Sequence, residues 1–347
     1  MILVLGGTGF IGGAVVRELL RPLPGTTPGS TTRSTPGSVP GSPLGSLSGS
    51  PLGPVPGSDV RVLTRRPLPG WMTDAGVRAI PGDLSDPASL YGCCEGVDTV
   101  LHMASYVGRD PALCTAVNDI GTRALAQAAQ QAGTERILYV STASVYGSGP
   151  HRGATEGQLT PNPASAASAS RLRAEQTVLE RGGIVLRPHL VYGPGDQWFV
   201  PLLCRLLRKV PVWAEGGSAR TSLVGVRDLA RAIAVFASSD WSADQGSVYH
   251  VNHPRPVTLR SVVARLCQGL GIPQPDMDLP RSAHLELSTR ALPQLSAHQH
   301  ALLTVDHYYE SSRIWNRLSL DPGPGFGAGL AAGLPWYRKH LAELRIA

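Results

Sequence analysis

The chain has 347 residues, of which 42% are apolar, and its formal net charge at pH 7 is +6. This length suits one large α/β unit or two lobes, and the apolar share is that of an ordinary globular protein. The charge is spread along the chain without zinc-ligand spacing or a basic stripe interleaved with aromatic residues, so we expect no nucleic-acid partner and no metal.

Residues 1–20 predict a buried strand, a glycine-rich loop and a helix, in that order. Gly6 allows a tight turn, and Gly9 lets the backbone approach a pyrophosphate at the positive end of the helix. Gly12 lets the helix pack closely on the strand. This context predicts a dinucleotide-binding loop, whose cofactor-binding residues we expect to be Gly6, Thr8, Gly9, Phe10, Ile11 and Gly12.

Residues 22–58 interrupt this pattern with a segment in which Pro-Gly-Ser recurs and Arg33 is the only charge. The segment has no periodic apolar face, so we predict that it is disordered. It connects the first helix to the second strand at the amino ends of the strands, whereas ligands bind at the carboxyl ends. We therefore expect it to be dispensable for cofactor binding; an interaction arm is the alternative.

The second strand, residues 60–64, ends at Arg65 and Arg66. An acidic residue here would select NAD, whereas arginine accommodates the 2′-phosphate of NADP. Since no acid occurs at this point, we predict NADP(H); two solvated surface arginines are the alternative. Further along, loops after predicted strands supply more expected cofactor contacts, namely Asp83, Leu84, Met103, Ala104 and Ser105.

Alternation of strands and helices continues to residue 191, with strands predicted at 60–64, 99–103, 136–141 and 183–190. This order predicts an α/β fold, a Rossmann-type doubly wound parallel sheet with a smaller carboxyl-terminal substrate lobe. We assign residues 1–191 to the dinucleotide-binding domain and 192–347 mainly to the lobe, with residues 224–252 partly returning to the sheet.

The carboxyl-terminal part is less regular. We predict helices at 197–209 and 259–270 and a strand of the main sheet at 248–252. Residues 308–320 and 336–346 are expected to pack on the lobe. Residues 273–303 are poorly patterned and are expected to form a mobile wall or lid.

The chain contains several short motifs in a fixed order, and the ordered set identifies a family more specifically than any single motif does. The motifs are 6–12, 102–105 (His-Met-Ala-Ser), 118–122 (Asn-Asp-Ile-Gly-Thr), 141–147 (Ser-Thr-Ala-Ser-Val-Tyr-Gly), 186–196 and 224–230. In these motifs the chain resembles the extended branch of the short-chain dehydrogenase/reductase family, over nearly its whole length. The resemblance implies a nicotinamide cofactor that also contacts Pro188 and His189.

The resemblance also implies a catalytic serine or threonine, a tyrosine, and a lysine four residues after the tyrosine. Thr142 matches the first. The Ala-Glu pair at 174–175, which follows the family's lysine, puts the lysine position at Arg171 and the tyrosine position at Ala167. Neither tyrosine nor lysine occurs between residues 147 and 188. We therefore expect cofactor binding, including ribose contacts from Arg171, without the family's usual proton transfer.

Reduction of a ketone leaves an alkoxide that needs a proton or hydrogen bonds. We expect this proton to come from water held by Thr142 and Ser144, or from a phenol of the substrate beside its ketone. A hydroxyl or imidazole near the site is the alternative source, and most such side chains serve packing instead; the candidates are His102, Tyr106, Tyr146, His151, His189 and Tyr192.

The leading hypothesis is an NADPH-dependent ketoreductase acting on a small-molecule ketone. Loss of both catalytic residues resembles atypical family members of antibiotic pathways, such as angucyclinone ketoreductases, so we expect an aromatic polyketide as substrate. The alternatives are a non-catalytic NADP(H)-binding sensor or scaffold, and a sugar-nucleotide or sterol-type oxidoreductase with a rearranged site.

The remaining expectations concern location and assembly. Five irregularly spaced cysteines suit reduced thiols, the first strand begins at Met1, and no apolar run is long enough for a bilayer. We therefore expect a cytoplasmic protein without membrane partners, either a monomer or a homodimer.

Overall fold

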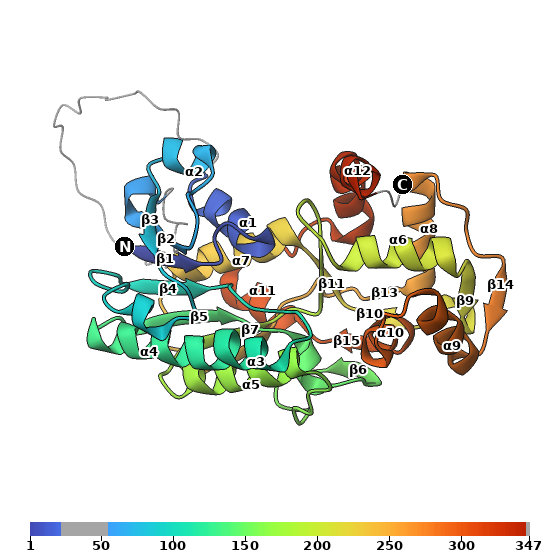
Figure 1. Cartoon of the computed structure of the whole chain (residues 1–347), viewed down its shortest axis with the longest axis horizontal. Coiled ribbons are helices and arrows are strands. Elements are labelled where there is room, and N and C mark those ends of the chain that lie inside the picture. Colours follow the sequence, from blue (N-terminus) through green and yellow to red (C-terminus); the bar gives the residue numbers. More distant parts are fainter. Residues whose placement is uncertain (22–54, 345–347) are drawn as a thin grey trace, which may run out of the picture.

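The computed structural model describes residues 1–21 and 55–344. Its larger part is built on a parallel seven-stranded sheet with the order β12-β7-β5-β4-β1-β2-β3 (Figure 1). The strands are β1 (Ile2–Leu5), β2 (Val60–Thr64), β3 (Arg78–Pro81), β4 (Thr99–His102), β5 (Arg136–Val140), β7 (Ile184–Arg187) and β12 (Val248–His250).

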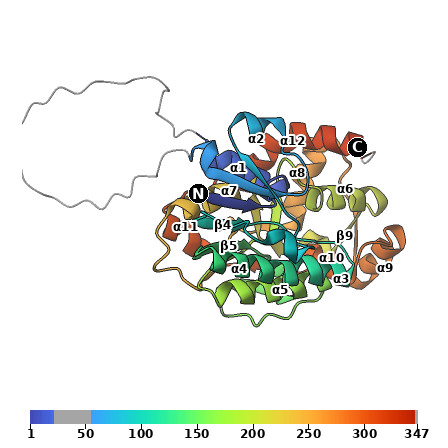
Figure 2. The same cartoon turned by 60° about the vertical axis from the view of Figure 1, so that its left-hand side comes forward.

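Helices cover both faces of this sheet, because its central strands are apolar on both sides. On one face lie α1 (Phe10–Leu19), α7 (Val226–Ser238) and α11 (Ser312–Leu318), and on the other α4 (Gly121–Gln131) and α5 (Ala166–Leu179) (Figures 1 and 2). The short helices α2 (Gly70–Asp74) and α3 (Pro111–Leu113) follow β2 and β4. The predicted Rossmann-type α/β fold is confirmed.

The strand order reverses at β1. From β1 the chain passes to β2 and β3 on one side, and then returns to place β4 on the other. In sheets of this kind, ligands bind at the carboxyl ends of the strands where the order reverses, which here is the edge that carries the loops after β1 and β4.

The smaller lobe contains a four-stranded sheet with the order β13-β10-β15-β6 and two pairs, β11-β8 and β14-β9. Its strands are β6 (His151–Ala154), β8 (Leu190–Tyr192), β9 (Val212–Ala214), β10 (Arg220–Thr221), β11 (Leu223–Gly225), β13 (Val257–Thr258), β14 (Met277–Leu279) and β15 (His307–Tyr309). Its helices are α6 (Phe199–Lys209), α8 (Leu259–Leu270), α9 (Arg281–Ala291), α10 (Ala297–Thr304) and α12 (Gly325–Glu343).

The predicted strand 183–190 is interrupted by Pro188 and His189. Proline lacks an N–H group for the sheet, and the His189 N–H donates instead to the Asn252 side chain at 2.8 Å. β7 therefore ends at Arg187, and β8 pairs with β11 outside the main sheet.

One prediction about the carboxyl-terminal part was wrong, and for residues 273–303 the structure shows regular elements without testing the predicted mobility. Helix α11, within 308–320, packs on the dinucleotide-binding domain, because Ile314, Trp315 and Leu318 are buried in the core that α7 and the main sheet share. Residues 273–303 are not irregular: they form β14, α9 and most of α10. The weak apolar periodicity of α9 and α10 concealed them, since part of their buried face is polar.

Of the segment 22–58, residues 22–54 lie outside the described residues. The described chain resumes at Val55, whose N–H donates to the Leu19 carbonyl at 3.0 Å and whose side chain packs against the core. Within the described ranges, we find no helix with the length and apolar character that a membrane crossing requires.

Candidate functional site

Four loops meet at the carboxyl edge of the main sheet. They are the glycine loop after β1, Met103–Ser105 after β4, Thr142 after β5, and Pro188–His189 after β7. Backbone hydrogen bonds join them in pairs: the Met103 N–H donates to Leu5 at 3.0 Å, and the Ala143 N–H donates to Pro188 at 2.8 Å. The structure thus brings the expected cofactor and catalytic residues to one edge.

The glycine loop closes on itself and on the neighbouring strand. Gly6 has φ +75°, and a Cβ atom there would lie 2.8 Å from the Ala104 nitrogen. A Cβ atom on Gly12 would lie 2.1 Å from the Gly6 carbonyl oxygen. Only glycine therefore fits at either position.

The first turn of α1 is open to an anion. Gly9 caps the helix and donates its N–H to Gly6 at 2.9 Å, but no side chain caps the following N–H groups. Phe10 and Ile11 are half-buried in this turn, and Thr8 is exposed at the loop tip. This arrangement fits the pyrophosphate of a dinucleotide.

Arg65 and Asp83, predicted as separate cofactor contacts, form an ion pair between Nη1 and Oδ2 at 3.4 Å. Burial raises the pKa of Asp83, but hydrogen bonds from Ser85 and the charge of Arg65 outweigh it, so that the net pKa is lowered. Arg66 is exposed beside them. The end of β2 thus presents two guanidinium groups and one carboxylate.

The loop after β4 carries an unpaired hydroxyl. Ser105 Oγ is buried and finds no partner in the described part of the chain. Leu84 is buried nearby and faces Gly121 of α4. This hydroxyl lies near the buried Tyr139 side chain, so Ser105 is placed at the edge of the sheet without a contact that assigns it to a cofactor.

The catalytic positions lie where β5 meets α5. The Thr142 hydroxyl accepts the Ser144 N–H at 3.1 Å and keeps its own proton free to donate. Ser144 is half-buried in the same short turn. Ala167 lies in the first turn of α5, and Arg171 Nη2 donates to the Val140 carbonyl at 3.0 Å. Arg171 is thereby held against the end of β5, next to Thr142.

Three of the alternative proton donors are buried and are hydrogen-bonded to, or packed against, other side chains. The Tyr146 hydroxyl pairs with His250 Nε2 at 2.8 Å and accepts from Arg187 at 2.8 Å, and burial raises its pKa. Burial lowers the pKa of His102 to about 3, and its Nε2 pairs with Thr122. Tyr192 is buried against Phe326 in the lobe.

Asn118 is a site residue to which sequence reasoning gave no role, although it lies in a quoted motif. Its side chain accepts the Tyr106 N–H at 2.7 Å and donates to the Tyr106 carbonyl at 2.8 Å and to Ser170 Oγ at 3.0 Å. It therefore clamps the loop after β4 to α5, one residue before Arg171.

A group of aromatic rings lies behind the end of β7. We call His151, His189, His307 and Tyr309 the imidazole cluster, after its three histidines. All four side chains are buried. Sequence reasoning named His151 and His189 only, because His307 and Tyr309 belong to β15, far along the chain and without a motif.

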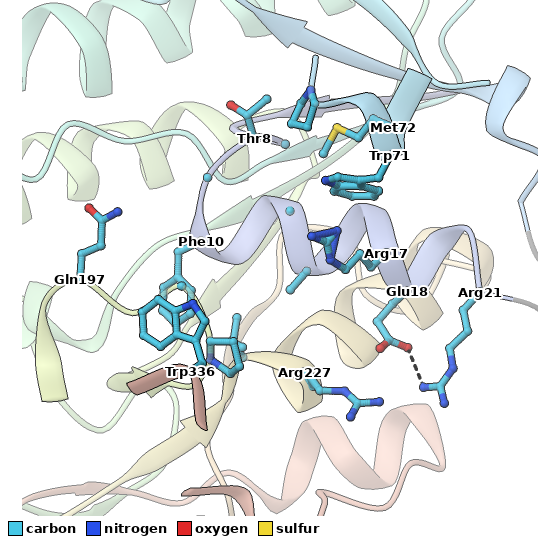
Figure 3. A pocket seen from close by; sticks show the side chains of 18 of the residues that line it. Thr8, Phe10, Arg17, Glu18, Arg21, Trp71, Met72, Gln197, Arg227 and Trp336 are labelled. Carbon is cyan, nitrogen blue, oxygen red and sulfur yellow. Dashed lines mark ion pairs between the residues drawn. The ribbon is translucent and has the colours of Figure 1, made fainter. Parts of the chain in front are cut away.

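A hollow of about 870 Å³ runs along the outer face of α1 and shares Gly7 to Phe10 with the glycine loop (Figure 3). The Arg17 guanidinium lies over Trp71 at 3.7 Å from the ring centroid. Thr142, Arg171 and His189 do not line the hollow, so it is not the predicted reaction site; its charged and large aromatic walls are Arg17, Glu18, Arg21, Arg227, Trp71, Trp198 and Trp336.

The fold and the glycine loop define a dinucleotide-binding protein of Rossmann type. The model of the NAD dependent epimerase/dehydratase family matches residues 52–251. The chain belongs to this family. The matched region begins near the end of the segment 22–58, and the glycine loop lies before it. Membership supports a nicotinamide cofactor, in agreement with the open first turn of α1.

The relatives include reductases and sugar-nucleotide enzymes. A 2-alkyl-3-oxoalkanoate reductase of Stenotrophomonas maltophilia is 30% identical over 58% of this chain and 65% of its own length. A 4-hydroxy-2-methyl-3-oxo-4-farnesyl-3,4-dihydroquinoline-1-oxide ketoreductase of Stigmatella aurantiaca is 30% identical, over 62% and 67%. A dTDP-glucose 4,6-dehydratase of Streptomyces niveus is 28% identical, over 98% and 94%.

The chain thus aligns with less than two thirds of the first reductase. Among solved structures, MoeE5 in complex with UDP-glucose and NAD is 25% identical, with a TM-score of 0.67 over 98% of this chain and 99% of the other. A double mutant of the dTDP-glucose 4,6-dehydratase DesIV of Streptomyces venezuelae is 23% identical, with a TM-score of 0.70 over the whole of both chains, and shows the shared fold.

Proposed function

We propose that this protein is an NADP(H)-dependent ketoreductase that reduces a small-molecule ketone, an aromatic polyketide of an antibiotic pathway. The observation that carries the proposal is Ala167 in the first turn of α5, one helical turn before Arg171. A methyl group at this position cannot act as the proton-transferring group. Simple hydride delivery remains possible, whereas chemistry that starts from a tyrosinate base does not.

The residues around Ala167 support a reduction in which the protein positions the reactants. When bound, the nicotinamide supplies a hydride. Arg171, held by the Val140 carbonyl, offers positive charge without releasing a proton near pH 7. The free proton of the Thr142 hydroxyl can be donated in a hydrogen bond to the substrate oxygen. Water or a phenol of the substrate then supplies the proton, and positioning accounts for much of the rate.

The two arginines at the end of β2 favour NADP(H) over NAD(H). Arg65 and Arg66 are both exposed, and Arg65 shares its charge with Asp83. The two cations outnumber the single carboxylate there, which suits a 2′-phosphate. The relatives named for reductase or ketoreductase activity support the same reaction class.

The test is to incubate the purified chain with NADPH and a panel of aromatic polyketide ketones. We expect oxidation of NADPH with at least one ketone, and one alcohol formed for each NADPH consumed. Thr142→Val should slow this reaction about tenfold, the loss of one hydrogen bond of about 1.4 kcal/mol. Tight NADPH binding without turnover of any ketone contradicts the proposal and favours a non-catalytic sensor.

A sugar-nucleotide oxidoreductase is the second candidate. It is favoured by the alignment of nearly the whole chain with the Streptomyces niveus dehydratase. Adding dTDP-glucose and NAD⁺ to the same assay distinguishes the two. Formation of a 4-keto sugar nucleotide would replace the ketoreductase proposal, whereas we expect none, because Ala167 removes the base that such chemistry uses.

A further inference from the structure

The hollow along the outer face of α1 is distinct from the expected cofactor site. Apart from residues 7–10, none of the expected cofactor contacts lines it. Side chains that line it occur along the whole helix, and from Phe10 to Arg21 the helix axis advances about 16 Å. The hollow therefore extends well beyond the turn that fits the pyrophosphate.

The hollow lies where the larger domain meets the lobe, because α1 runs between α2 and α12 (Figures 1 and 2). α1, α2 and the first turn of α7 line it from the larger domain, and Gln197, Trp198 and Trp336 line it from the lobe. Its volume of about 870 Å³ is that of a small-molecule site. Such sites are frequent at the boundary between two domains.

The hollow has an excess of positive charge. The charged side chains that line it are three guanidinium groups and one carboxylate, those of Arg17, Arg21, Arg227 and Glu18. Glu18 pairs with Arg21 at 3.6 Å, and Asp228, which follows Arg227, pairs with Arg231 at 3.1 Å. Arg17 and Arg227 are exposed and make no ion pair with a described residue. Their two charges are therefore available to an anion.

The Arg17 guanidinium is held in position by Trp71. Its carbon atom lies 3.7 Å from the centroid of the indole ring, and the two side chains lie one over the other in Figure 3. Stacking occupies one face of the guanidinium, whereas its N–H groups lie in the plane of the group and stay free at its edge. Arg17 is thus a positioned donor for a phosphate or carboxylate.

Indole rings supply the apolar surface of the hollow. Of the six tryptophans in the chain, Trp71, Trp198 and Trp336 line it, whereas the other three are buried. Trp198 is 60% exposed. Trp336 stacks on His340 with centroids 4.5 Å apart, which fixes its ring. Accessible indole faces bind planar aromatic rings by stacking.

We propose that this hollow is a second ligand site, which binds a small molecule that joins a planar aromatic ring to an anionic group such as phosphate or carboxylate. The indole rings contact the aromatic ring, and Arg17 donates to the anion. None of the reaction positions lines the hollow, so this inference does not depend on the proposed reaction. Because only the tip of the glycine loop is shared, ligand and cofactor are bound at the same time.

The test is calorimetric titration of the full chain, saturated with NADP⁺, with three probes. 1-Naphthyl phosphate carries both the ring and the anion, 1-naphthol only the ring, and inorganic phosphate only the anion. The variants are Arg17→Gln and Trp198→Ala. Their matched controls are Arg290→Gln, an exposed arginine on α9, and Tyr91→Ala, an aromatic side chain that is 84% exposed; both lie outside the hollow. Thermal unfolding is measured for every variant.

We expect 1-naphthyl phosphate to bind at least tenfold more tightly than either of the other probes, because the ring and the anion are recognised together. Arg17→Gln should weaken its binding at least tenfold, the loss of a charge-assisted hydrogen bond, and Trp198→Ala about fivefold, the loss of a stacking contact. Both controls should stay within about twofold of the wild type, and NADP⁺ affinity should be unchanged in all four variants.

Three results would overturn the inference. The first is the absence of binding of 1-naphthyl phosphate to the wild type. The second is equal binding to the wild type and to folded Arg17→Gln and Trp198→Ala, which would place the probe elsewhere on the protein. The third is displacement of the probe by NADP⁺, which would make the hollow a part of the cofactor site.

Discussion

Arg65 and Arg66 occupy adjacent positions but differ in how much of their charge is available. Arg65 shares its charge with Asp83, whereas the Arg66 side chain is exposed and makes no ion pair with any described residue. A charge-assisted hydrogen bond to a phosphate is worth about 1.5–3 kcal/mol. The contribution to NADP(H) selectivity should therefore be larger for Arg66.

We predict that Arg66→Ala weakens NADPH binding more than tenfold and leaves NADH binding within about twofold, because only NADPH carries the 2′-phosphate. Arg65→Ala should have a smaller effect of the same kind. Fluorescence titration of both cofactors measures the ratio. Arg78→Ala is the control, since Arg78 lies at the amino end of β3, where its guanidinium donates to the Ser58 carbonyl at 2.8 Å. Equal weakening of both cofactors would refute the role in selectivity.

Helices α9 and α10 are joined through a pair of buried histidines. His284 Nδ1 and His300 Nε2 lie 2.8 Å apart, and Ser288 and Thr304 reach the same two rings from 3.2 Å. One ring must donate to the other, so the accepting ring is neutral and the two rings cannot both be protonated in this arrangement. Burial, together with the smaller effects of the neighbouring His284 and Arg281, lowers the pKa of His300 to about 4. Burial also lowers the pKa of His284.

This pair should make the protein sensitive to acid. A histidine in the unfolded chain has a pKa of about 6.5, so between about pH 6.5 and pH 4 the unfolded state binds the proton that folded His300 does not. The free energy of unfolding therefore falls as the pH is lowered through this window, by at most about 1.4 kcal/mol per pH unit for this group.

Urea denaturation at pH 7.5, 6.0 and 5.0 measures this slope. The double variant His284→Gln/His300→Gln should lose less stability on acidification than the wild type. His340→Gln, with a half-buried ring on α12, serves as control and should keep the wild-type slope. The same slope in the double variant and the wild type would mean that other groups cause the acid sensitivity.

At the scale of the molecule, a buried ion pair connects the two sheets. Glu175 on α5 accepts from Arg187 Nε at 3.0 Å, and Arg187 donates to Tyr146. His250 accepts the Tyr146 hydroxyl and donates its Nδ1–H to the Glu310 carbonyl, at 3.1 Å, directly after β15. The chain of contacts thus runs from α5 through β7 and β12 to the edge of the lobe.

We predict that Glu175→Gln lowers the free energy of unfolding by about 3 kcal/mol, because it leaves the Arg187 charge buried without its counter-charge. Glu215→Gln is the matched control. Its partner is Arg281, and both side chains are 44% exposed, so its loss should cost less than about 1 kcal/mol. Chemical denaturation of both variants measures the difference. A similar small effect in the two would show that the buried pair does not stabilise the fold.

Much of the fold could be predicted from local patterns. Local periodicity and backbone requirements depend only on neighbouring residues. They predicted the glycine loop, the strand 60–64 and the helix 259–270. The sequence pattern did not predict that β7 ends at Arg187, although the following Pro188 helps to explain this end. The cause lies partly in Asn252, which follows β12 far along the chain and accepts the His189 N–H.

By itself, the sequence determined the class of fold, the kind of cofactor that the loop can hold, and the absence of tyrosine and lysine before Pro188, since each follows from residue type and local spacing. Only the tertiary structure decided which polar side chains are hydrogen-bonded to other residues of the protein. Tyr146 looked available and is bonded to Arg187 and His250, whereas His189 stacks on His307 with its nitrogens unpaired in the described chain. Such partners come from strands far apart in the chain, and burial removes the water that would otherwise satisfy each group.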